Sequence, residues 1–184
     1  MSKIKFSKKD LDECKQFSDS IDTSFYESRN QFDDNKRKID TIIGKAGELA
    51  VYYLLKETYS EITYPDFMIY SAKHKSWDYD LKTSSINIHV KSQNYLQGIN
   101  FGESWIFQNE DKHIFKNYKD NDYVAFVTVN LIEKHGTIKK ILPVKLLHEQ
   151  GLFKKPVLAK LVSKSAIYYD DIKDIEGYLL KEDK

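Results

Sequence analysis

Four polar side chains that could act together on a phosphodiester bond occur between residues 80 and 93. Residues 86–93 read Ile-Asn-Ile-His-Val-Lys-Ser-Gln, an alternation that predicts a strand with one apolar face. His89, Lys91 and Gln93 then share the opposite face. Residues 76–81 predict a preceding strand that carries Asp80, and residues 82–85 predict a polar hairpin turn. A carboxylate can hold a divalent cation, and a nearby ammonium can position water and stabilise the charge that develops on a phosphate.

Two other aspartates compete with Asp80 for the metal-binding role. Asp78 lies on the same predicted strand face, and Asp66 directly follows a proline. We expect Asp66 to open a separate strand over residues 67–69, so we favour Asp80, with Asp78 as the second choice. The alternative for the whole hairpin is a surface element in which Asp80 and Lys91 form a solvated ion pair.

A third acid, Glu48, lies about thirty residues upstream in an apolar helix that ends near Lys56. One face of this helix is predicted by apolar residues at helical spacing, namely Ile39, Ile43, Ala46, Ala50 and Leu54. Glu48 lies off that face but has apolar neighbours one turn later. An acid in such surroundings is either functional or paired with a nearby lysine.

The order of these elements resembles the PD-(D/E)XK nuclease superfamily, which includes many restriction endonucleases and Holliday-junction resolvases. The resemblance covers residues 38 to 95, about half of the chain. It implies that Glu48 and Asp80 are metal-binding acids, that Lys91 is the motif lysine and that Gln93 matches a glutamine found in some branches. It also implies a restriction-endonuclease-like core, a central mixed sheet flanked by helices, with Mg²⁺ as the cofactor.

His89 departs from the family pattern, which usually has Asp or Glu two positions before the lysine. Imidazole suits transition metals better than Mg²⁺, so Mn²⁺ is a second candidate cofactor. Three alternatives follow: His89 binds a softer metal, it carries a proton near neutral pH, or the site is inactive. We favour an active site, because Glu48 and Asp80 still provide two acids and the carbonyl of Val90 offers a third oxygen ligand.

Length and composition suit a single domain. The chain has 184 residues, 41% of them hydrophobic, and we divide it into an N-terminal helical arm (1–37) and a nuclease-like domain with a C-terminal extension (38–184). No apolar run approaches the roughly 20 residues of a membrane span, and residues 1–6 are too polar for a signal peptide, so we expect a cytoplasmic protein with no membrane partner. Cys14 is the only cysteine, which excludes an internal disulfide and favours an idle thiol.

Charge is distributed unevenly although the formal net charge is only +1. Residues 10–34 hold eight acids against Lys15 and Arg29, and residues 133–164 hold eight lysines against Glu133 and Glu149. The basic segment is the expected place for phosphate contacts, since lysines near DNA release condensed counterions. The alternative is an ordinary solvated surface.

Further elements complete an α/β arrangement. We expect a helix capped by Ser7 that runs to Phe17, strands over 104–108, 123–131, 138–144 and 166–170, and a helix over 144–151 that stops at Gly151. The strand over 123–131 is the most continuously apolar and is expected at the sheet centre. Residues 95–102 contain two glycines and predict a turn region. Nearby aromatics either form core or stack on bases, and the amides at 94, 97, 100 and 108 could read base edges.

The sequence therefore predicts a metal-dependent DNA endonuclease of the restriction or phage type. Because cutting both strands usually takes two active sites, a homodimer is the favoured assembly. Two alternatives are kept: a nuclease-like module that binds DNA or a partner without cutting, and an unrelated α/β protein whose basic segment binds another protein.

Overall fold

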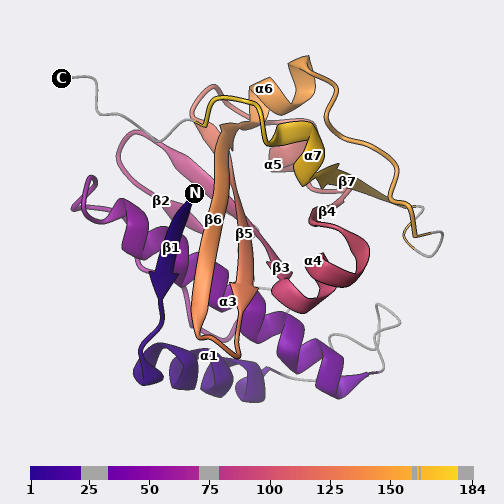
Figure 1. Cartoon of the computed structure of the whole chain (residues 1–184). Helices are drawn as coiled ribbons and strands as arrows, with labels where there is room; N and C mark the ends of the chain where they lie inside the picture. The colour runs from indigo at the N-terminus through magenta and orange to yellow at the C-terminus, as the bar shows by residue number, and fades with distance from the viewer. Residues whose placement is uncertain (22–32, 71–78, 159–160, 162, 178–184) are drawn as a thin grey trace.

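A five-stranded mixed sheet with the strand order β1-β6-β5-β3-β2 forms the centre of the computed structural model (Figure 1). The model describes residues 1–21, 33–70, 79–158, 161 and 163–177. The strands are β1 (Ser2–Lys5), β2 (Leu81–Lys82), β3 (Asn87–Asn94), β5 (Asp122–Asn130) and β6 (His135–Pro143). β3 and β5 are parallel, and the other neighbouring strands are antiparallel. The predicted mixed sheet is confirmed, and so is the central position of the strand at 123–131.

The long helix α3 (Asp34–Leu55) covers one face of the sheet, and α1 (Lys8–Ser20) packs against α3 beneath the strands (Figure 1). The predicted cap of α1 is confirmed: the Ser7 hydroxyl accepts from the Asp10 amide, and the Asp10 carboxylate accepts from the Ser7 amide. Asp33 caps α3 by accepting from the Lys36 amide. Between these helices and the sheet lies an apolar core that includes Leu49 and Ile88.

A second layer covers the opposite face of the sheet. It contains the antiparallel pair β4 (Ser104–Gln108) and β7 (Lys164–Tyr168), with the short helices α5 (Lys112–Phe115), α6 (Val144–Glu149) and α7 (Tyr169–Ile172). Its core includes Trp105, Phe107 and Phe126, each at most 1% exposed. The aromatics at 105 and 107 are therefore core residues and do not form a stacking surface.

Two predictions about local structure are wrong, and the bounds of a third are shifted. Residues 95–102 contain the helix α4 (Tyr95–Phe101), which Asn94 caps and Gly102 ends with a φ of 84°. Residues 67–69 form no strand; the Asp66 carboxylate instead accepts from the Met68 amide. The last strand begins and ends two residues earlier than expected, because its end turns directly into α7. Gly151 stops α6 as predicted, with a φ of 61°.

The predicted first strand of the hairpin is only partly seen. Residues 71–78, which include Asp78, lie outside the described residues, and β2 contains only Leu81 and Lys82. In a regular strand Tyr79 and Leu81 would share one face, but here they do not. Leu81 packs in the core beneath α3, whereas the Tyr79 ring contacts His89 and His113, because regular pairing begins only at Leu81.

Part of the charge in the two charged segments is paired with residues of other elements. In the basic segment Lys139 pairs with Glu103, Lys145 with Asp120 and Lys154 with Asp171, at 2.6 to 3.1 Å; Lys160 lies outside the described residues. In the acidic segment Asp10 binds Tyr53, and Asp19 pairs with Lys38 of α3. No helix in the described ranges has the length and apolarity that crossing a bilayer requires.

Candidate functional site

Glu48 lies on the inner side of α3 and is only 8% exposed. Its Oε2 accepts from the ammonium of Lys45, one turn earlier, at 2.7 Å. The Lys45 ammonium also lies 5.0 Å from the Phe17 ring centroid and 5.6 Å from that of Phe67. Glu48 is thus both buried in apolar surroundings and paired with a lysine, which combines the two alternatives that the sequence left open.

Burial raises the pKa of Glu48 from 4.5 to about 8, and the nearby Asp80 carboxylate is the next largest cause. Lys45 lowers this pKa without compensating for burial and for Asp80, and Asp66 raises it further. The fold therefore brings Glu48 and Asp80, from elements about thirty residues apart, close enough to repel each other. Clustered acids of this kind mark functional sites more often than ordinary surfaces.

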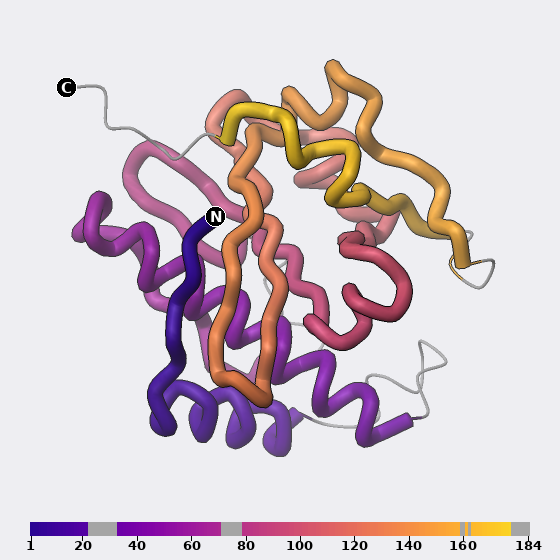
Figure 2. The backbone as a smooth tube through the Cα atoms, in the orientation of Figure 1, coloured from indigo at the N-terminus to yellow at the C-terminus, as the bar shows by residue number. Residues whose placement is uncertain are grey.

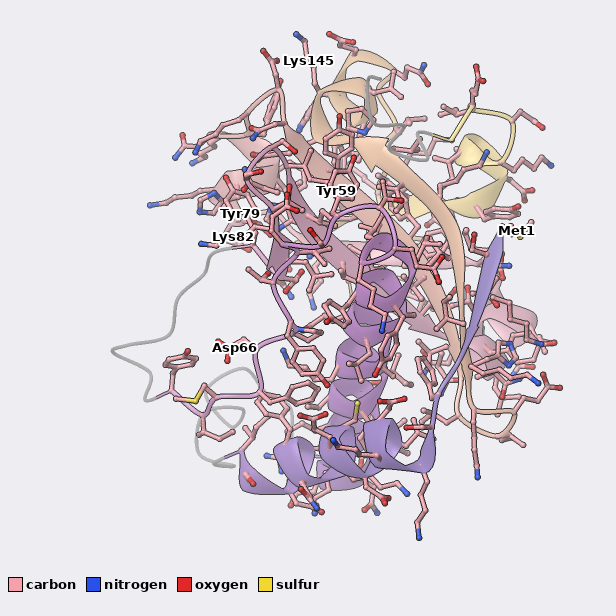
Figure 3. All side chains as sticks on the ribbon, turned by 90° about the vertical axis from the view of Figure 1, so that its left-hand side faces the viewer. Met1, Tyr59, Asp66, Tyr79, Lys82 and Lys145 are labelled. Carbon is pink, nitrogen blue, oxygen red and sulfur yellow. The ribbon has the colours of Figure 1, made fainter. Side chains whose placement is uncertain are left out.

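Asp80 directly precedes β2, at the point where the described pairing of β3 with β2 stops. Its Oδ2 accepts from the Val90 amide at 2.7 Å, and its own amide donates to the Ile88 carbonyl. Figure 3 shows the chain segment between α3 and β3, which carries Asp66, Tyr79 and Lys82, along one side of the molecule. The Asp80 carboxylate thereby accepts the hydrogen bond that a neighbouring strand would otherwise accept from Val90 at this edge of the sheet.

The backbone carbonyl of Val90 faces the same edge. The Asn87 amide donates to Asn121 on the β5 side of β3, and backbone groups alternate between the two edges of a strand, so those of Val90 point toward Asp80. The register of β2 stops at the Leu81–Ile88 pair. Within the described ranges no strand pairs with Val90 on this edge, which leaves its carbonyl beside the Asp80 carboxylate.

His89 is buried on the sheet face that points away from α3. Its ring centroid lies 5.0 Å from that of Tyr79 and 6.2 Å from that of His113. Burial lowers the pKa of His89, and Lys91 acts in the same direction, while Asp80, Asp111 and Asp122 oppose the shift. Its buried Nε2 has no hydrogen-bond partner among the described residues. Burial thus favours the neutral form of His89, and its Nε2 is left without a partner among the described residues.

Lys91 extends from the same face and lies over the Phe107 ring, 5.1 Å from its centroid. Its ammonium is 4.0 Å from Asp111 Oδ2, and both side chains are about one quarter exposed. The other carboxylate oxygen of Asp111 caps α5 by accepting from the His113 and Ile114 amides. Sequence reasoning missed both Asp111 and the helix α5 that it caps, and the proximity of Asp111 to Lys91 appears only in the folded structure.

Gln93 is used differently from what the resemblance implies. Its Nε2 donates to the Gly102 carbonyl and its Oε1 accepts from the Ser104 amide, both at 3.0 Å. Gln93 therefore fastens the segment that follows α4 back onto β3. Its contacts are with backbone, and none is with Glu48 or Asp80.

The predicted site residues thus occupy two sides of the sheet. Glu48 approaches from the α3 side, where Val90 and Ser92 lie next to Gly47. His89, Lys91 and Gln93 lie on the opposite side, and Asp80 stands at the edge between them, with electrostatic coupling to both Glu48 and His89. Asp66 is exposed and is also coupled to Glu48.

These residues fit a hard divalent cation at the open edge of β3. Mg²⁺ is usually held by one or two carboxylates together with water and substrate phosphate, and Glu48, Asp80 and the Val90 carbonyl are all oxygen ligands. Two mutually repelling carboxylates would also be stabilised by a positive charge. Among the described residues no three His, Cys, Asp or Glu side chains form a ready-made metal cluster, which a two-carboxylate site does not require.

Comparison with protein-family models and with curated proteins found no match for this chain.

Proposed function

We propose that the protein is a divalent-metal-dependent DNA endonuclease of the PD-(D/E)XK type, restriction-like or phage-like. The observation that carries the proposal is the buried Glu48, whose pKa is raised to about 8 by burial and by Asp80, next to the open edge that Val90 presents. The order of elements supports it: a helix with Glu48, a hairpin with Asp80 and His89-Val90-Lys91, then a connection of α4, β4 and α5 that leads to the parallel strand β5.

Each residue has a definable task in this proposal. Glu48, Asp80 and the Val90 carbonyl would hold Mg²⁺ or Mn²⁺, and the bound cation would neutralise charge that develops on the scissile phosphate. Lys91 would orient the attacking water and stabilise the same charge from the other side. His89 has a lowered pKa and a buried Nε2 without a partner among the described residues, so it would accept a proton only once water reaches that nitrogen. Cleavage of both strands would require two copies of the chain.

A second candidate is a nuclease-like module that binds DNA or a partner without cutting it. One observation favours it: the Lys91 ammonium pairs with Asp111 on the face away from Glu48. His89 in the place of an acid points in the same direction.

A cleavage assay on supercoiled and linear DNA separates the two candidates. We would incubate the protein with Mg²⁺, Mn²⁺ or a chelator and compare it with Glu48→Gln, Asp80→Asn and Lys91→Ala. The nuclease proposal predicts metal-dependent cutting that each substitution reduces by about a hundredfold or more. Asp66→Asn is the matched control, because it removes a neighbouring acid that we do not place on the metal.

Two results would contradict the proposal. Intact DNA under every metal condition, despite clear binding, would favour the silent module. Normal cutting by Asp80→Asn together with loss of cutting in Asp66→Asn would transfer the metal-binding role to Asp66.

A further inference from the structure

The helix α4 presents an exposed and uncharged surface. Leu96, Ile99 and Phe101 are 49%, 62% and 74% exposed, and Tyr95 is 39% exposed. Gln97 and Asn100 lie exposed between them. Residues 92–102 contain no charged side chain, although 31% of the whole chain is charged. Exposed apolar groups gathered in this way mark a contact surface.

The base of this surface is firmly held. Gln93 bonds to Gly102 and Ser104, on the far side of the helix, and Asn94 Oδ1 accepts from the Leu96 amide. Gly98 is the buried residue of α4, and a Cβ there would lie 3.2 Å from Gln93 Oε1. In Figure 2 the segment projects as a compact loop from the end of β3. A projection fixed at both ends loses little entropy when it binds.

Area and composition indicate what this surface binds. An aromatic side chain offers about 150–250 Å², so the exposed parts of the four apolar side chains amount to roughly 400 Å². A standard protein interface buries about 800 Å² on each partner, so α4 alone is small for a stable dimer contact. Apolar wedges combined with side-chain amides are what groove-binding proteins insert between base steps and against base edges.

We propose that α4 inserts into a groove of duplex DNA, with Ile99 and Phe101 as wedge residues and Gln97 and Asn100 facing base edges. This inference rests on the proposed nuclease function for the position of the DNA. Tyr95, the first residue of α4, lies four residues beyond Lys91 of β3, at most about 13 Å of extended chain. In the proposed complex the duplex runs along β3, so this span corresponds to about four base pairs of B-DNA between α4 and the scissile phosphate.

The absence of charge on α4 makes the test specific. Because α4 has no lysine or arginine, its contacts release no counterions, and its removal leaves the dependence of log K on log salt unchanged. We would measure DNA affinity at several salt concentrations, in chelator, for the natural protein and for Ile99→Ala/Phe101→Ala. Ile132→Ala, an equally apolar residue that is 75% exposed on the β5–β6 turn, is the matched control.

A fluorescent base analogue reports insertion directly. With 2-aminopurine placed at successive positions of a short duplex, wedging by the natural protein and by Ile132→Ala raises the fluorescence of the base that unstacks. The double variant gives no rise and binds about tenfold more weakly with the same salt slope. Equal affinity and fluorescence for all three proteins would overturn the inference. A change of molecular mass in the double variant, seen by light scattering, would also overturn it by assigning α4 to a second copy of the chain.

This test and the cleavage assay fail independently. Cutting that is unaffected by the α4 substitutions would leave the nuclease proposal standing and remove the inference. Insertion into DNA without cleavage would leave the inference standing and remove the nuclease proposal.

Discussion

Glu48 couples the candidate site to protein stability. Its pKa in the folded protein is about 8, against an ordinary value of 4.5. Between these pH values the folded state retains a proton that the unfolded state has lost, so stability falls as pH rises through this window. We expect a slope of up to about 1.4 kcal/mol per pH unit in metal-free urea unfolding, and we expect Glu48→Gln to lack it. Parallel pH profiles for the two proteins would contradict the assignment.

Substitution of Asp111 can separate its charge beside Lys91 from its structural role as the cap of α5. Asp111→Asn keeps an oxygen that can cap α5 but removes the negative charge beside Lys91. Since Asn and Asp cap helices about equally well, we expect stability to stay within about 0.5 kcal/mol, whereas Asp111→Ala loses about 1 kcal/mol. We expect cleavage by Asp111→Asn to fall about tenfold, as for other groups that orient a functional side chain. Full activity in Asp111→Asn would show that Lys91 needs no partner.

The types of the site residues could be predicted from sequence, but their partners only in part. Lys45 was within reach of sequence reasoning, because residues three apart on a helix are neighbours. Asp111 was not, since it meets Lys91 only when β4 and α5 fold over the far face of the sheet. The burial of Glu48 followed from its apolar neighbours, whereas its repulsion by Asp80 depends on the hairpin returning beneath α3.

At the scale of elements, the contact between α3 and β3 depends on one glycine. A Cβ added to Gly47 would lie 1.9 Å from Ser92 Oγ and 3.0 Å from Ser92 Cβ, so the Ser92 hydroxyl must rotate away and the contact between helix and strand must widen slightly. We expect Gly47→Ala to destabilise the protein by about 1–3 kcal/mol in chemical denaturation. Gly44→Ala, on the same helix with no atom within 4 Å of the added Cβ, should stabilise it by up to about 1 kcal/mol. If both substitutions changed the free energy of unfolding in the same direction, close packing at Gly47 would be excluded as the cause of its effect.

Elements with a clear hydrophobic pattern or a local cap could be predicted from the sequence, and elements determined by tertiary contacts could not. The apolar run of β5 and the capped α1 were found because local pattern and fold agree. The segment that contains α4 carries two glycines, which suggested a turn, but Gly98 is used for close packing against Gln93 and only Gly102 ends the helix. The strand expected at 67–69 failed because Asp66 bonds its own local backbone.

For the molecule as a whole, β5 joins the two cores. Ala125, Val127 and Val129 belong to the core beneath α1 and α3, while Val124 and Phe126 belong to the core beneath the second layer. If either core came apart, one apolar face of β5 would be exposed to water, and the strand would no longer support the other core firmly. We therefore expect the described layers to unfold together in a single transition.

Cys14 provides a direct measure of that transition. The thiol is fully buried in the α1–α3 core, and its pKa is raised to about 12, chiefly by burial and then by Glu48. Because only an exposed thiolate reacts, we expect a thiol reagent at pH 8 to label Cys14 no faster than the whole molecule unfolds. Ser20→Cys in a Cys14→Ala background, exposed at the end of the same helix, should react at once. Equal rates at the two positions would show that α1 detaches by itself and that the cores do not unfold as one unit.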